Sequence, residues 1–117
     1  MQLDVTSDSS LRSAVSSVEA ILSETGSSLW CVVNNAAALV FADAEWQTKR
    51  LVSRQFDVNV IGALEVSKAF LPMLRKTEGR IVNMMSFCTD CPLPTLSVYT
   101  ATKVRNVVDR VTGFPPG

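Results

Sequence analysis

The chain has 117 residues, of which 47% are hydrophobic and 19% are charged, a composition typical of one small packed domain. Eleven basic and eleven acidic residues leave no net charge, so no nucleic acid or anionic surface is expected as a partner. No apolar run approaches the ~20 residues of a membrane-spanning helix, and the first residues do not resemble a signal peptide. We therefore expect an intracellular protein without a transmembrane segment, with cytoplasm, endoplasmic reticulum and mitochondrion all open. Its three cysteines fit a reducing compartment.

The first predicted elements are the end of a strand and a long helix. Residues 3–5 are predicted to end a strand, and residues 6–8 offer side chains that can cap a helix. Apolar side chains then recur at helical spacing until Gly26, which is predicted to end the helix. These side chains are Leu11, Val15, Val18 and Leu22.

The next elements predict βαβ units and therefore a parallel sheet. The apolar run at residues 29–33 predicts a strand buried on both faces. A helical region is predicted from about residue 45 to 75, and Pro72 is expected to distort or end it. Residues 80–84 predict a second buried strand, and the helix that begins before Tyr99 is expected to continue through residues 104–111.

The strongest chemical signal is the pair Tyr99 and Lys103 with Ser86 upstream. In a helix, residues four apart share one face, and an ammonium beside a phenol favours its ionised form, which suits proton transfer. Ser86 follows the predicted strand at 80–84, at the carboxyl edge where open α/β sheets keep their sites. Two alternatives stay open at this point. The pair could belong to a solvent-exposed helix face, and Ser86 could be a turn residue that caps the following segment.

Taken in order, these pieces resemble the short-chain dehydrogenases/reductases, and within them the branch of retinol, 17β-hydroxysteroid and D-β-hydroxybutyrate dehydrogenases. The resemblance implies an α/β fold with a partial Rossmann-like, doubly wound parallel sheet. The first βαβ unit and the C-terminal strands of that fold are expected to be lacking, so residues 1–117 would form a single incomplete dinucleotide-binding-type domain. The segments that carry the resemblance are Leu3-Asp4-Val5-Thr6, Asn34-Asn35-Ala36, Asp57-Val58-Asn59-Val60-Ile61-Gly62, Gly79-Arg80-Ile81-Val82-Asn83, Ser86 and Tyr99-x-x-x-Lys103.

The resemblance implies four catalytic residues. Tyr99 would exchange a proton with the oxygen of an alcohol or ketone substrate. Lys103 would assist the phenol and hydrogen-bond the nicotinamide ribose. Ser86 would hold the substrate oxygen, and Asn59 would support a water that relays protons to the lysine. For Asn59 the alternative is a surface position on an imperfect helix, because asparagine competes for backbone hydrogen bonds.

The resemblance also implies NAD or NADP as cofactor, contacted by Asp4, Asn34 and Ala36 together with Tyr99 and Lys103. Asp4 would contact the adenine ring; the alternative is a plain acidic residue at the end of a strand. Residues 34–37 resemble the family's Asn-Asn-Ala-Gly turn, with alanine where glycine is usual. The family's glycine-rich turn, which binds the pyrophosphate, has no counterpart in the sequence. We therefore expect the chain alone to bind neither dinucleotide measurably.

The Cys88-x-x-Cys91 spacing suits a redox pair or half of a zinc site. The chain has no histidine, and the third cysteine, Cys31, lies in a predicted strand. Because Asp90 and Pro92 are typical loop residues, we interpret this segment as an ordinary loop and expect neither a redox pair nor a metal site.

Two functions remain open on the sequence. The first is an NAD(P)-dependent oxidoreductase acting on an alcohol or ketone of retinoid, steroid or hydroxy-acid type. The second is a truncated, catalytically inactive fragment or isoform that acts by association, as a homo-oligomer or with related chains.

Overall fold

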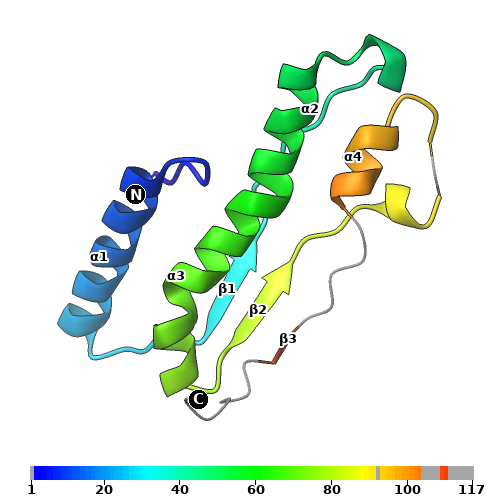
Figure 1. The fold of residues 1–117 in the computed structure, drawn as a ribbon. Helices are drawn as coiled ribbons and strands as arrows, with labels where there is room; N and C mark the ends of the chain where they lie inside the picture. The colour runs from blue at the N-terminus through cyan, green and yellow to red at the C-terminus, as the bar shows by residue number, and fades with distance from the viewer. Residues whose placement is uncertain (1, 92, 104–108, 111–117) are drawn as a thin grey trace, which may run out of the picture.

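The computed structural model describes residues 2–91, 93–103 and 109–110. Helices and strands alternate along the chain, as Figure 1 shows. In order, they are α1 (Asp8–Thr25), β1 (Cys31–Asn34), the 3₁₀ helix η1 (Ala44–Trp46), α2 (Lys49–Phe56), the π-helical segment η2 (Asp57–Gly62), α3 (Ala63–Lys76), β2 (Arg80–Asn83), the 3₁₀ helix η3 (Phe87–Thr89), α4 (Ser97–Thr102) and β3 (Asp109–Arg110).

The sheet has the order β1-β2-β3. β1 and β2 are parallel, with Cys31 opposite Arg80 and Asn34 opposite Asn83, which confirms the predicted parallel α/β core. The helix expected through residues 104–111 is wrong at Asp109–Arg110, because these two residues form β3 and pair antiparallel with β2. The open edge of β2 offers this backbone a row of hydrogen-bond partners. Residues 104–108 and 111 lie outside the described part of the chain.

The ends of α1 are set by two local signals that the sequence predicts correctly. Ser7 is the N-cap, and its side chain accepts a hydrogen bond from the Ser10 amide. Gly26 ends the helix in the left-handed region at φ 63°, a conformation that costs glycine little, and its amide bonds to the Leu22 carbonyl.

Residues 3–5 do not form the predicted strand end. In the part of the chain that the structure describes, no strand lies beside them, so their backbone has no ladder to join. Leu3 and Val5 nevertheless pack against the core. Gly62 allows this approach, because a Cβ at Gly62 would lie 2.7 Å from Val5 Cγ2.

The helical region predicted from 45 to 75 is divided into η1, α2, η2 and α3, and it does not end at Pro72. α3 runs through Pro72 to Lys76. Pro72 is exposed, so water can satisfy the Lys68 carbonyl that the proline leaves without its helical donor. The irregular turn is instead η2, where Asn59 and Gly62 are buried. Such π-helical turns are common at functional sites.

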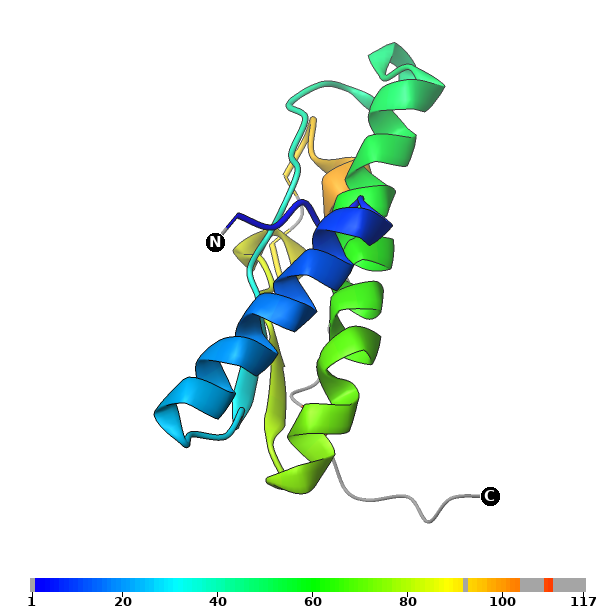
Figure 2. The same cartoon turned by 90° about the vertical axis from the view of Figure 1, so that its left-hand side faces the viewer.

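The core lies between α1, α3 and one face of the sheet (Figure 2). Leu11 of α1 meets Val66 and Phe70 of α3, and Val32 of β1 packs against this cluster. Val33 points to the other face of the strand and is 55% exposed. The described elements thus cover the α3 side of β1 and leave the Val33 side open, so the prediction of a strand buried on both faces is wrong for the described part of the chain.

Candidate active site

The site begins at the carboxyl ends of β1 and β2, where two asparagines face α3. Asn34 Nδ2 lies 2.8 Å from Asn83 Oδ1 and 2.9 Å from Ser67 Oγ. The Ala63 carbonyl is a third acceptor at 3.3 Å. The side chain of Asn34 therefore fastens the two strands to the first turns of α3 and forms a polar floor.

Asn59 connects this floor to α4. Its Oδ1 accepts a hydrogen bond from the Ala38 amide at 2.7 Å, and its Nδ2 donates to the Ala38 carbonyl at 2.9 Å. The same Nδ2 donates to Thr102 Oγ1 at 2.7 Å. Asn59 is only 5% exposed, so these bonds are formed away from water. The alternative of a surface asparagine is wrong.

Lys103 follows α4 directly and is buried with only 7% of its surface exposed. Its Nζ donates a 2.9 Å hydrogen bond to the Met84 carbonyl, just beyond β2. Burial lowers the pKa of Lys103 from its ordinary value of 10.5, because an ammonium is poorly solvated there. An ammonium has three donors, and only one of them is used among the described residues, which leaves two for a ligand or for Tyr99.

Ser86 and Tyr99 lie on the two segments that flank Lys103. Ser86 is the N-cap of η3, and its Oγ accepts a 3.3 Å hydrogen bond from the Cys88 amide. The capping alternative is therefore correct, and it leaves the hydroxyl hydrogen of Ser86 available to a substrate oxygen. Tyr99 is half-buried in α4, and its carbonyl accepts from Thr102 Oγ1 at 2.7 Å. Among the described residues, no hydrogen bond joins the side chains of Ser86 and Tyr99.

Two hollows meet at Asn34 and Ala36. The larger, of about 240 Å³, is mainly apolar and is lined by Leu3, Val5 and Val33 together with the turn after β1. The smaller, of about 20 Å³, is lined by polar groups that include Asn59, Thr102 and Lys103. The exposed Ala36 is thus placed between an apolar hollow and the buried lysine.

Asp4 lies beside the larger hollow but is not among the residues that line it. Its Oδ1 accepts hydrogen bonds from Thr6 Oγ1 at 2.7 Å and from the Thr6 amide at 2.9 Å. These two bonds, the side-chain bond first, hold the pKa of Asp4 below its ordinary value. Asp4 is exposed, and in this structure it stabilises the turn that leads into α1.

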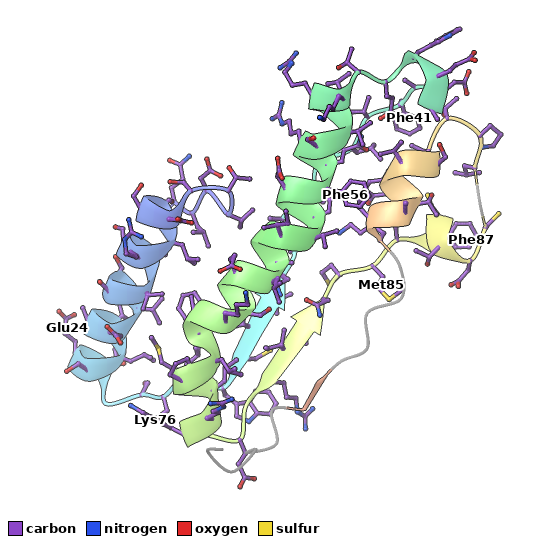
Figure 3. All side chains as sticks on the ribbon, in the orientation of Figure 1. Glu24, Phe41, Phe56, Lys76, Met85 and Phe87 are labelled. Carbon is purple, nitrogen blue, oxygen red and sulfur yellow. The ribbon has the colours of Figure 1, made fainter. Side chains whose placement is uncertain are left out.

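Apolar side chains surround the site on its outer side. Figure 3 shows Met85 and Phe87 on the segment that leaves β2, and Phe41 and Phe56 near α4. Phe41 is 71% exposed and Phe87 is 73% exposed. The approach to the site is therefore apolar, whereas its floor is polar.

A buried pair of amides supports the loop between β1 and α2. Gln55 is fully buried and donates through Nε2 to Gln47 Oε1 at 2.8 Å and to the Leu51 carbonyl at 3.2 Å. Gln47 in turn donates to the Ala42 carbonyl at 2.9 Å. The Ala42 amide bonds to the Thr95 carbonyl, just before α4. Gln55 Oε1 has no hydrogen-bond partner among the described residues.

The structure therefore brings together Asn34, Ala36, Asn59 and Lys103 around one hollow. It places Ser86 and Tyr99 on adjoining segments, and Asp4 apart. Sequence reasoning missed Thr102, whose hydroxyl joins Asn59 to α4, and the Met84 carbonyl that holds Lys103. A polar side chain inside the Tyr-x-x-x-Lys segment was the available signal for Thr102.

No group of three or more histidine, cysteine, aspartate or glutamate side chains is arranged as a metal site in residues 2–91, 93–103 and 109–110. None of the helices within those ranges is long and apolar enough to cross a membrane.

The parallel strands, the helix between them and the polar groups at their carboxyl ends define a Rossmann-type α/β protein. The family model described as short chain dehydrogenase matches residues 1–107, and the chain belongs to this family of oxidoreductases. The resemblance inferred from the sequence is thereby confirmed.

Named relatives and solved structures agree with this assignment. The chain is 38% identical to 17-beta-hydroxysteroid dehydrogenase type 2 of Homo sapiens over 104 residues, 88% of this chain and 26% of the relative. It is 32% identical to the mitochondrial D-beta-hydroxybutyrate dehydrogenase of Rattus norvegicus over 103 residues, 88% of this chain and 30% of the relative. The crystal structure of NAD+-bound xylitol dehydrogenase superposes with a TM-score of 0.71 at 27% identity, covering 86% of this chain and 38% of that one. The chain thus spans about a quarter to a third of the length of these two curated relatives.

Proposed function

We propose that this chain supplies the catalytic segment of an NAD(P)-dependent oxidoreductase that acts on an alcohol or ketone of retinoid, steroid or hydroxy-acid type. The observation that carries the proposal is the placement of Lys103, which is buried and held by the Met84 carbonyl beside the Asn59–Thr102 hydrogen bond. A buried cation at the carboxyl end of a parallel strand needs a partner that compensates its desolvation. A tyrosine phenol and a ribose hydroxyl are such partners.

The proton chemistry is assigned to Tyr99, Lys103 and Ser86. The Tyr99 phenol would exchange a proton with the substrate oxygen, and the Lys103 ammonium would stabilise the phenolate form. The Ser86 hydroxyl, whose oxygen caps η3, would donate its hydrogen to the same substrate oxygen. The apolar surroundings at Met85 and Phe87 favour a substrate with a large apolar part.

Asn59 is assigned a positioning role through Thr102, which immediately precedes Lys103. Its Nδ2 is already engaged with Ala38 and Thr102, so its side chain would meet a relay water only as an acceptor. The water relay to Lys103 stays a prediction.

The residues present fit one part of a dinucleotide. Lys103 would hold the nicotinamide ribose, and the apolar hollow beside Asn34 and Ala36 is suited to a flat ring. Asp4 would reach an adenine ring only if its bonds to Thr6 were exchanged for new ones. The nicotinamide supplies the hydride acceptor or donor when it is bound. We propose that residues 1–117 contribute this part of a dinucleotide-binding domain, whether the cofactor is NAD or NADP.

A chimera tests the catalytic assignment. Residues 1–107 replace the matching segment of human 17-beta-hydroxysteroid dehydrogenase type 2, and steroid, retinol and 3-hydroxybutyrate are assayed with each dinucleotide. We expect turnover that falls roughly 10²–10⁴-fold in Tyr99→Phe. The exposed Ser13→Ala serves as a control and should retain it. A folded chimera whose turnover survives Tyr99→Phe would contradict the assignment.

The second candidate function is association without catalysis, and the open edge of β1 favours it. β1 pairs only with β2 among the described strands, and Val33 and Trp30 are more than half exposed. Exposed apolar edges pair with other chains. Concentration-dependent size-exclusion chromatography of the chain tests this candidate. Val33→Lys should shift the chain toward monomer, whereas the control Ser53→Lys on α2 should not.

A further inference from the structure

We propose that Cys88 and Cys91 form a reversible intramolecular disulfide, which makes the turn after Ser86 a site of thiol–disulfide exchange with a small disulfide such as glutathione disulfide. All three cysteines of the chain are free thiols in the structure. The exchange needs only the turn and its two thiols. It therefore goes beyond the proposed oxidoreductase function and does not depend on it.

The backbone holds the two cysteines one helical turn apart. Cys88 lies in η3, and Asp90 continues the right-handed helical conformation at φ −99° and ψ −26°. The amides of Asp90 and Cys91 both bond to the Phe87 carbonyl, at 3.0 and 3.1 Å. Residues three apart in such a turn lie on the same side, with Cβ atoms about 5–6 Å apart. A disulfide needs a Cβ separation of about 3.5–4.5 Å, so the two Cβ atoms must move closer together for the bond to form. Within the loop expected from Asp90 and Pro92, Phe87–Thr89 form a short 3₁₀ turn.

The two thiols differ in exposure in the way that exchange requires. Cys91 is exposed, whereas Cys88 is buried at 9%. The Cys91 thiolate can attack glutathione disulfide, forming a mixed disulfide and releasing one glutathione thiolate. The Cys88 thiolate then attacks the Cys91 sulfur and releases the second glutathione. Two cysteine thiols are oxidised, one glutathione disulfide is reduced to two thiols, and the protons balance.

Cys31 is excluded as a competing partner by its place in the sheet. It begins β1 opposite Arg80, the first residue of β2, whereas Cys88 follows the carboxyl end of β2. The two lie toward opposite ends of the parallel strands. Cys31 therefore serves as an internal control.

The crosslink would act directly on the segment that holds Ser86. Ser86 Oγ accepts from the Cys88 amide, and the Ser86 carbonyl accepts from the Thr89 amide at 3.1 Å and from Thr89 Oγ1 at 2.7 Å. Closing residues 88 and 91 into a ring fixes this hydrogen-bonded turn. In the reduced chain, no covalent bond closes the turn.

Equilibration of the full chain with mixtures of glutathione and glutathione disulfide tests the proposal. After acid quenching and alkylation with N-ethylmaleimide, trypsin releases residues 81–103 as one peptide that contains both cysteines, and residues 13–49 as one that contains Cys31. We expect the first peptide to lose two hydrogens and resist alkylation in oxidising mixtures, while Cys31 stays alkylated. The equilibrium constant for forming the Cys88–Cys91 disulfide should be about tenfold or more larger in the native chain than in the chain unfolded in guanidinium chloride, because the native turn holds the two thiols together.

Three variants sharpen the result. Cys31→Ser should behave as the parent chain does. Cys88→Ser should accumulate glutathione on Cys91, and Cys91→Ser should leave Cys88 reduced because it is buried. Two alkyl groups on peptide 81–103 in every mixture would overturn the proposal. Glutathione on both cysteines would overturn it as well. Equal equilibrium constants for disulfide formation in the native and the denatured chain would also overturn it.

Discussion

Asn59 and Thr102 are 43 residues apart in the chain and share a buried hydrogen bond of 2.7 Å. Asn59 belongs to the π-helical segment η2, and Thr102 is the last residue of α4. Because Thr102 precedes Lys103, this bond helps to position the lysine, whose ammonium also donates to the Met84 carbonyl. Four predictions concern this bond and the packing around it.

Asn59→Ala should lower the free energy of unfolding by about 1–3 kcal/mol, because it leaves Thr102 Oγ1 and both backbone groups of Ala38 without their partner. Urea unfolding followed by circular dichroism measures the change. Asn35 is also an asparagine but is exposed, so Asn35→Ala is the matched control and should change the free energy of unfolding little. If Asn59→Ala and Asn35→Ala lower the free energy of unfolding equally, the buried amide of Asn59 contributes no more to stability than the exposed amide of Asn35.

Lys103→Met should change the pH dependence of stability. The pKa of Lys103 is lowered in the folded chain, so above that value the unfolded chain binds more protons than the folded one. Stability of the parent chain therefore rises with pH between the folded value and 10.5, and the variant lacks this gain. Urea unfolding from pH 7 to 10 checks the sign. Lys49→Met, at the exposed start of α2, corrects for the loss of charge. If the difference in free energy of unfolding between the parent chain and Lys103→Met does not change with pH, or changes in the opposite direction, the burial of a charged Lys103 is contradicted.

Gln47 and Gln55 should be energetically coupled. Gln55→Met removes the unpartnered Oε1 together with two donated bonds, and it leaves Gln47 Oε1 without its donor. Replacing both by methionine should cost less than the sum of the single changes, with a coupling of about 0.5–3 kcal/mol. A double-mutant cycle measures it. Gln55→Met with Thr25→Ala, at the last residue of α1, should be additive. If the losses of stability caused by changing Gln47 and Gln55 simply add, the hydrogen bond between the two side chains is contradicted.

Gly62→Ala should destabilise the chain by about 1–3 kcal/mol, since its methyl group would lie 2.7 Å from Val5 Cγ2 and 3.1 Å from the Asp57 carbonyl. Thermal melting measures the loss. Val5→Ala in the same chain should restore part of it by removing the clash. If the chain with both Gly62→Ala and Val5→Ala loses as much stability as the two single variants together, residues 3–5 do not pack against η2 as described.

The parts of the fold that were predictable depend on local signals. Ser7 and Gly26 set the ends of α1 by side-chain capping and positive φ, and both are readable from a few neighbouring residues. The strand cores at residues 31–33 and 80–83 follow from short apolar runs. Pro72 does not end α3, because it is exposed and water can satisfy the carbonyl that it leaves without a donor, which periodicity alone does not reveal.

The residues of the site could be chosen from the sequence, but their hydrogen-bond partners could not. Lys103 and Asn59 could be chosen from the resemblance, yet their partners, Met84 and Thr102, come from distant segments. The Met84 contact uses a backbone carbonyl, which no side-chain pattern identifies. The absence of a strand at residues 3–5 is likewise a tertiary effect, because strand formation needs a neighbour that local sequence does not reveal.

The parallel pairing of β1 and β2 has a kinetic consequence. Residues 35–79 separate the two strands, so every folding molecule must close this long crossover before the first hydrogen bond between β1 and β2 forms. Helix α3 lies within the crossover and shortens the search if it forms early. Helix α4 follows β2 in the chain and docks on Asn59 through Thr102. Substitutions in α3 would therefore act mainly on the rate of folding, and loss of the Thr102 hydroxyl mainly on the rate of unfolding.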